Sequence, residues 1–212
     1  EKFERSTKIK KKTISAMDLF SALIKERAET GRIYIMNVDH CNTHSSFLDT
    51  VYMSNLCQEI TLPTKPLTHI DDPDGEIALC ILSAINVGII RNLDELEELC
   101  ELAVRALEEI IDYQKYPIKA AEISTKARRS LGVGYIGLAH YLAKNQVKYD
   151  DPKAWQLVHD LSEAFQYYLL KASNTLAKER GPCEYYDRTK YSVGILPIDT
   201  YKKEVDTIVE NK

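Results

Sequence analysis

The feature that most constrains the fold is an apolar stripe that recurs at helical spacing through residues 96–111. Its members are Leu96, Leu99, Cys100, Ala103, Val104, Leu107, Ile110 and Ile111. Residues three and four apart share one face of a helix, so the stripe predicts an amphipathic helix that ends near Tyr113. A chain of 212 residues is long enough to supply the core for such a helix, as one domain or as a large piece of a bigger one.

Capping residues predict where the other helices begin and end. Further helices are expected at residues 16–28, 120–128 and 136–144, and from Asp151 to Gly181. Ser15 with Asp18 forms a capping pair for the first of these helices, and Gly31 marks its stop. For the last, Asp151 is the N-cap and Pro152 occupies the first helical position, where its missing N–H costs nothing.

The extended segments are concentrated before residue 91. Strands or extended chain are expected at residues 32–38, 51–62 and at least the first half of 77–90, with polar loops at 41–48 and 63–75. Strands followed by helices predict an α/β fold, in which 1–91 is a strand and loop part and 92–212 is mainly helical. The tail, residues 195–212, is expected to form a turn and part of a helix.

Composition excludes several classes of protein. The chain is 44% hydrophobic and 28% charged with a net charge of -4, so it is no basic nucleic-acid binder. It has no secretory signal and no long apolar run, so a cytoplasmic protein without a membrane segment is expected. The number of cysteines is five, which is odd, and their irregular spacing favours a reducing compartment over a disulfide scaffold. The start at Glu1, without an initiator Met, suggests a fragment or a processed chain.

One short segment carries the chemistry. Asn55, Cys57 and Glu59 stand at alternating positions, and alternate side chains converge on one face of an extended strand or taut loop. The hydrophobic residues around them predict a dry environment, in which an amide and a carboxylate are costly to bury without a role. A lone Cys is more often a small buried hydrophobe, which is the ordinary interpretation of Cys80 in its apolar run.

This segment is also the start of a family resemblance. Residues 55–59 (Asn-Leu-Cys-Gln-Glu) and 75–80 (Gly-Glu-Ile-Ala-Leu-Cys) resemble the catalytic core of the large subunit of class I ribonucleotide reductase. The likeness continues at residues 31–35, 37–39, 92–96, 129–134 and 194–199. The resemblance implies part of a ten-stranded α/β barrel, with the active cysteine on a loop in its centre. Residues 1–212 would form a single incomplete barrel segment, without the amino-terminal regulatory domain, the carboxy-terminal cysteine pair or the radical-relay tyrosines.

The resemblance also implies roles for the residues. Cys57 would carry a thiyl radical, Glu59 would accept a proton, and Asn55 would hydrogen-bond the substrate hydroxyls. Cys80 would be a redox-active thiol whose partner cysteine lies outside this chain. The implied reaction reduces ribonucleoside diphosphates to deoxyribonucleoside diphosphates.

The same resemblance implies the partners. These are the rest of the large subunit, a small subunit with a metal and tyrosyl radical, and thioredoxin or glutaredoxin, with ATP or dNTP effectors bound elsewhere. No cofactor or metal is assigned to residues of this chain, and the isolated chain is expected to be inactive. The alternative is a non-catalytic truncated fragment that folds or assembles only with the rest of the large subunit.

Other motifs favour structural roles. Residues 132–137 read G-x-G-x-x-G, but residues 124–130 before them are polar and basic rather than a buried strand, so close packing at a helix start is favoured over dinucleotide binding. His40 and His44 have the spacing of metal ligands, yet no second cluster completes a site, and polar hydrogen bonding in a loop is favoured. The remaining cysteines are expected to be structural: Cys41, Cys100 and Cys183.

Overall fold

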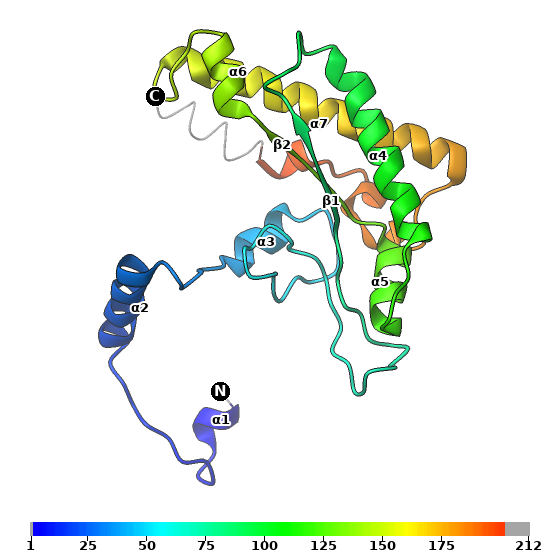
Figure 1. Ribbon diagram of the computed structural model, residues 1–212. Helices are drawn as coiled ribbons and strands as arrows, with labels where there is room; N and C mark the ends of the chain where they lie inside the picture. Colours follow the sequence, from blue (N-terminus) through cyan, green and yellow to red (C-terminus); the bar gives the residue numbers. More distant parts are fainter. Residues whose placement is uncertain (1, 202–212) are drawn as a thin grey trace.

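The computed structural model describes residues 2–201, which form a small sheet covered by long helices and preceded by an extended amino-terminal part (Figure 1). In chain order the elements are α1 (Lys2–Arg5), α2 (Ala16–Thr30), α3 (Val38–His44), β1 (Ile81–Asn86), α4 (Glu95–Tyr113), α5 (Lys119–Arg128), β2 (Leu131–Ile136), α6 (Leu138–Lys144), α7 (Pro152–Arg180) and the 3-10 helices Tyr186–Arg188 and Lys190–Val193. None of the helices within residues 2–201 combines the length and apolarity needed to cross a membrane.

The sheet is two-stranded and parallel. Ile81 of β1 lies opposite Leu131 of β2, and Asn86 lies opposite Ile136. Parallel neighbours need a long crossover, and here α4 and α5 provide it. The core between the sheet, α4 and α7 is apolar, with the buried residues Ile85, Val87, Ile90, Leu96, Cys100, Leu161 and Phe165. The apolar stripe of α4 thus packs against the sheet and α7, as an amphipathic helix requires.

The predicted helices agree with the structure, because their signals are local. Ser15 caps α2 by accepting a hydrogen bond from the Asp18 amide, and Gly31 ends the helix in the left-handed region at φ 65°. Asp151 caps α7, Pro152 opens it, and it closes at Gly181. No residue of α2 is buried, and the helix lies apart from the sheet and its covering helices (Figure 1).

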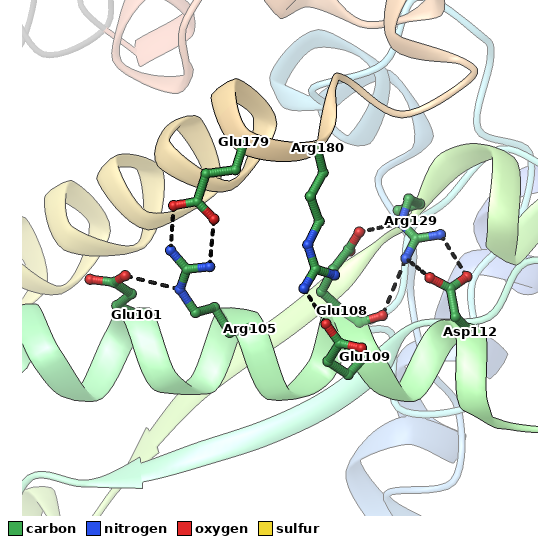
Figure 2. Close-up of polar contacts among 8 residues, drawn as sticks. All are labelled: Glu101, Arg105, Glu108, Glu109, Asp112, Arg129, Glu179 and Arg180. Carbon is green, nitrogen blue, oxygen red and sulfur yellow. Dashed lines mark hydrogen bonds and ion pairs between the residues drawn. The ribbon is translucent and has the colours of Figure 1, made fainter.

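Ion pairs line the contact between α4 and α7 and the turn before β2 (Figure 2). Arg105 of α4 binds Glu179 of α7 through two hydrogen bonds of 2.7 Å. Further pairs join Arg105 to Glu101, Lys171 to Glu97, Arg180 to Glu109, and Arg129 to Glu108 and Asp112. The pairs between α4 and α7 are largely solvent-accessible, and such pairs stabilise a fold by only about 0–1 kcal/mol each, so the apolar core holds the two helices together.

The strand predictions were largely wrong. Residues 32–37 have no regular structure, and the expected loop at 41–48 begins inside α3. Residues 51–62 contain a turn at 56–58 instead of a strand. An isolated extended segment is not a strand until another segment pairs with it, and no described residue does so here. In the 77–90 run the strand is confined to β1, so only part of the expected first half is strand.

The prediction for residues 132–137 was also wrong in part. Gly132 and Gly134 lie within β2, and only Gly137 stands at a helix start, as the N-cap of α6. The polar residues before β2 belong to α5, which ends at Arg128. The α/β class is correct, but residues 2–201 are helix-rich and contain two of the strands expected of a barrel, not a closed one. The end of the expected carboxy-terminal helix, residues 202–212, lies outside the described residues.

Candidate active site

The loop of residues 52–62 leaves the body of the protein between two buried residues, Val51 and Pro63. Asn42 of α3 holds its start: the Asn42 side-chain amide donates to the Val51 carbonyl at 2.9 Å, and the Val51 amide donates to Asn42 Oδ1 at 2.8 Å. The Asn42 side chain thus satisfies both the N–H and the C=O of Val51, as a neighbouring strand would. One side chain therefore orients the backbone at the start of the loop. Asn42 and His44 thus both make polar hydrogen bonds, as expected for this stretch, but they lie in a helix rather than a loop.

Asn55 closes the loop on itself. Its side-chain oxygen accepts from the Ile60 amide at 3.0 Å, and its carbonyl accepts from the Gln58 amide at 3.2 Å. Gln58 takes a positive φ of 66°, which is uncommon for a residue with a side chain and is typical of a tight turn. Cys57 therefore stands at the tip of a taut turn, which is the second of the two geometries that the alternation allowed.

The prediction of a dry environment was wrong for the described residues. Cys57 and Glu59 are exposed, and Asn55 is only partly buried. The apolar neighbours in sequence do not cover them: Leu56 is 76% exposed and Tyr52 is 69% exposed. A turn projects its residues outward, whereas a strand in a sheet would have directed one side of the segment into the core.

Cys80 lies beside this loop, one residue before β1. Burial raises the pKa of its half-buried thiol, and the negative charge of Glu59 raises it further. The structure therefore brings Glu59 and Cys80 within electrostatic reach, although 20 positions separate them in sequence. The raised pKa keeps the Cys80 thiol protonated at neutral pH, and a protonated thiol is a weaker nucleophile than a thiolate.

Gly132 of β2 provides the space for the Cys80 thiol. A Cβ atom added at Gly132 would lie 2.9 Å from Cys80 Sγ and 2.4 Å from Leu82 Cδ2. Only a residue without a side chain allows the strand to approach the sulfur this closely. The sequence interpretation of Gly132 missed this role, because the contact joins β2 to the residues at the start of β1, about 50 positions earlier in the chain.

Behind the loop lies a buried cluster of ion pairs that the sequence did not reveal. We call it the Arg128 cluster, and its members are Asp49, Lys65, Glu76, Arg128 and Arg188. Burial opposes ionisation of Glu76, yet hydrogen bonds from Arg128 and Lys65 hold the pKa of this carboxyl below its ordinary value. A buried Glu directly before an apolar run was the one available sign that a partner cation was needed.

The remaining motifs lie elsewhere. His44 stacks on the Tyr201 ring and bonds to the Thr200 hydroxyl, and its ring centroid is 6.4 Å from that of His40. Among residues 2–201, one group of possible metal ligands lies on the surface of α7. It consists of His159, Asp160 and Glu163, whose ligand atoms lie within 4.8 Å of one another. A surface hollow of about 600 Å³ near the start of α4 is lined mainly by carboxylates. Neither feature includes a residue of the Cys57 loop.

The parallel sheet and its helices define an α/β protein. All five cysteines are free, so the thiols of the candidate site, Cys57 and Cys80, are available for chemistry. Residues 1–211 match the family model described as "Ribonucleotide reductase, barrel domain". The chain belongs to this family.

Several curated relatives are similar along nearly the whole chain. It is 60% identical over 212 residues to the ribonucleoside-diphosphate reductase subunit alpha of Haemophilus influenzae, covering 99% of the chain, and 59% identical over 210 residues to the ribonucleoside-diphosphate reductase 1 subunit alpha of Escherichia coli, covering 98%. It is 33% identical over 205 residues to the large subunit of Plasmodium falciparum, covering 92%. The chain spans 28% of the length of both bacterial relatives and 24% of the third.

Proposed function

We propose that the chain is the catalytic segment of a ribonucleoside-diphosphate reductase large subunit. The proposal rests on one observation above others: the hydrogen-bonded turn between Asn55 and Ile60 holds Cys57 and Glu59 on one exposed loop, and the charge of Glu59 acts on the Cys80 thiol. A carboxylate and two free thiols at one site match the needs of a reaction that moves a proton, a hydrogen atom and an electron pair. Membership of the family supports the same chemistry.

The chemical difficulty is that the ribose 2′-hydroxyl is a poor leaving group. A radical at the neighbouring C3′ carbon makes its departure easier. In the proposed reaction Cys57, as a thiyl radical, takes the hydrogen atom from C3′, and Glu59 accepts the proton of the 3′-hydroxyl as general base. Asn55 hydrogen-bonds the substrate hydroxyls and orients them.

The reduction needs two electrons, which the proposal assigns to thiols. Cys80 protonates the departing 2′-hydroxyl, which leaves as water. Cys80 and a second thiol from another part of the large subunit then form a disulfide, and the electron pair and second proton that they release become the new C2′–H bond. Glu59 returns its proton to the 3′-oxygen. The Cys57 thiol returns its hydrogen atom to C3′, and the products are a deoxyribonucleoside diphosphate, water and one disulfide.

Asn55 has two tasks in this proposal. Its side-chain oxygen already accepts the Ile60 amide, so its side-chain N–H₂ group is the part available for substrate. The amide thus shapes the turn on one side and can donate to a hydroxyl on the other. This arrangement predicts that Asn55 tolerates substitution less well than a residue that only contacts substrate.

The reaction requires partners that supply what this chain lacks. A radical-generating small subunit would oxidise Cys57, and thioredoxin or glutaredoxin would reduce the disulfide by thiol exchange. The rest of the large subunit would contribute the second thiol and the contacts to the substrate phosphates. The isolated chain is therefore expected to form no deoxyribonucleotide.

The test is deoxyribonucleoside diphosphate formation by the complete large subunit with its small subunit. Cys57→Ser should abolish turnover, because an O–H bond is too strong to exchange a hydrogen atom with the ribose at low cost. Cys41→Ser is the matched control, since Cys41 is a free, half-buried cysteine in α3 with no proposed role. If Cys57→Ser retained more than roughly a hundredth of normal turnover, about 2.7 kcal/mol of barrier, Cys57 would not be the radical carrier.

A further inference from the structure

We infer that the buried Arg128 cluster is a positioning device that holds the Cys57 loop at both of its ends. The expected effect on catalysis rests on the proposed function, whereas the effect on the position of the loop does not. Each end of the loop is adjacent to an acidic or basic member of the cluster: Asp49 precedes Val51, and Lys65 follows Pro63.

The centre of the cluster is dry. The side chain of Arg128 is 3% exposed and that of Glu76 is 1% exposed, and Arg128 Nε donates to Glu76 Oε2 at 2.7 Å. From the same guanidinium, Nη1 donates to Asp49 Oδ2 at 3.0 Å. One planar cation therefore joins the chain before the loop to the chain after it, in a fork geometry that a lysine cannot reproduce.

The far end of the loop is fixed to the same centre. The Lys65 and Glu76 backbones exchange two hydrogen bonds, of 3.1 and 3.2 Å, and Lys65 Nζ lies 3.1 Å from Glu76 Oε1. The segment after α7 also contacts the cluster. Arg188 lies 2.8 Å from Asp49 Oδ2, and both arginines lie over the Tyr185 ring, with centroid distances of 5.1 Å to Arg128 and 4.3 Å to Arg188.

The loop has little else to hold it. Among residues 2–201, every hydrogen bond made by residues 52–62 stays inside the loop, from Ser54 to Asn55 and between Asn55, Gln58 and Ile60. Internal bonds give the turn its shape but do not orient it relative to β1 and Cys80. The orientation of the turn is therefore set by its ends, where Asn42 and the Arg128 cluster act.

Burial of these charges is not explained by stability alone. Replacing a buried ion pair with apolar residues of similar volume is often neutral or stabilising, so such a pair is weak evidence for stability. Apolar side chains could fill the same space, but they would not select one direction for the entering and leaving chain. Directed hydrogen bonds from Arg128 do select one.

The experiment is hydrogen exchange, measured by mass spectrometry, in the complete large subunit carrying Arg128→Met. Exchange of residues 52–62 should be faster by about tenfold or more, while residues 152–180 of α7 remain unchanged, because only the loop loses its anchor. Arg105→Met is the matched control: it too removes an arginine that bonds two carboxylates, Glu101 and Glu179, but at the contact between α4 and α7, and it should leave the exchange of residues 52–62 unchanged. Arg128→Lys should recover part of the protection.

The second readout separates positioning from simple loss of fold. With reductase activity as proposed, Arg128→Met should lower kcat by about a hundredfold with little change in KM, because a misplacement near 1 Å has that order of effect. If Arg128→Met does not fold, Asp49→Asn replaces it, since Asp49 is 27% exposed at the edge of the cluster. Unchanged loop exchange in the variant that folds, or equal acceleration throughout the protein, would overturn the inference. If the proposed function were wrong, the Cys57→Ser variant would keep its activity. The hydrogen-exchange result would still test the positioning role of the cluster by itself.

Discussion

Gly132 offers the sharpest test of how the structure positions Cys80. In Gly132→Ala the new methyl group would lie 2.9 Å from Cys80 Sγ and 2.4 Å from Leu82 Cδ2. Both distances are shorter than ordinary contacts of about 3.5–4.0 Å, so each neighbour must move by about 1 Å. Leu82 is 55% exposed and can swing into solvent, whereas Cys80 is half buried and must rotate its thiol away from its present position.

The magnitudes follow from that difference. Overpacking of this kind costs about 1–3 kcal/mol, and the lower end is expected here because Leu82 yields easily. The effect on turnover should be larger, about a hundredfold in kcat, since a reacting group is displaced by about 1 Å. Urea unfolding measures the first quantity, deoxyribonucleoside diphosphate formation by the complete enzyme measures the second, and the alkylation rate of Cys80 reports its rotation directly.

Gly134→Ala is the matched control in the same strand. The nearest atom to a Cβ at Gly134 is the Ser83 carbonyl oxygen at 4.0 Å, so the added methyl group meets no clash. Both variants remove a strand glycine, but only the methyl group at position 132 meets the Cys80 thiol and the mobile Leu82 side chain. If the two variants showed the same turnover and the same Cys80 alkylation rate, the close approach of Gly132 would not position Cys80.

Other expected outcomes concern the loop and its surroundings. Glu59→Gln should slow turnover by roughly 10²–10⁴-fold, since an amide cannot accept a proton, and normal turnover with Gln would remove Glu59 from the mechanism. Asn42→Ala should speed hydrogen exchange at Val51, with unchanged exchange in α7, because both bonds to the Val51 backbone are lost. Asp72 accepts hydrogen bonds from the Thr68 hydroxyl, the Thr68 amide and the Asp74 amide, which lower its pKa from 3.8 to about 2. A carboxyl whose pKa is lower in the folded than in the unfolded state stabilises the fold at pH values above its unfolded pKa, and this stabilisation is lost as the pH falls through its folded pKa. In urea unfolding, the difference in free energy of unfolding between wild type and Asp72→Asn should therefore be largest above pH 4 and absent below about pH 2.

The sequence predicted the helices well and the strands poorly, for a physical reason. A helix satisfies its own backbone, and its caps and apolar stripe stand within a few residues of each other, as Ser15 and Gly31 do for α2. A strand depends on a neighbour. Residues 32–38 and 51–62 have strand-like composition but no described partner, while β2, which contains Gly132 and Gly134, becomes a strand because β1 lies beside it.

The candidate site divides in the same way. The identity and spacing of Asn55, Cys57 and Glu59 are properties of the sequence alone, and together with the other matching segments they indicate the family, from which the thiol-based reaction is proposed. Their exposure on a turn, and the nearness of Glu59 to Cys80, depend on how the loop returns to the start of β1. Only tertiary structure could decide these features, because the contacts that produce them join residues far apart in the chain.

The Arg128 cluster is the clearest case. Asp49, Glu76, Arg128 and Arg188 are ordinary charged residues in the sequence, and each would be expected at the surface. Folding brings them together around a dry centre made by Glu76 and Arg128, where a carboxylate is tolerated only beside a cation, with Asp49 and Arg188 at the partly exposed edge. The sequence by itself determined the local helices and the chemistry carried by the Cys57 loop, whereas the tertiary structure alone decided which buried charges hold that loop, because ion pairing depends on distance in space and not on distance along the chain.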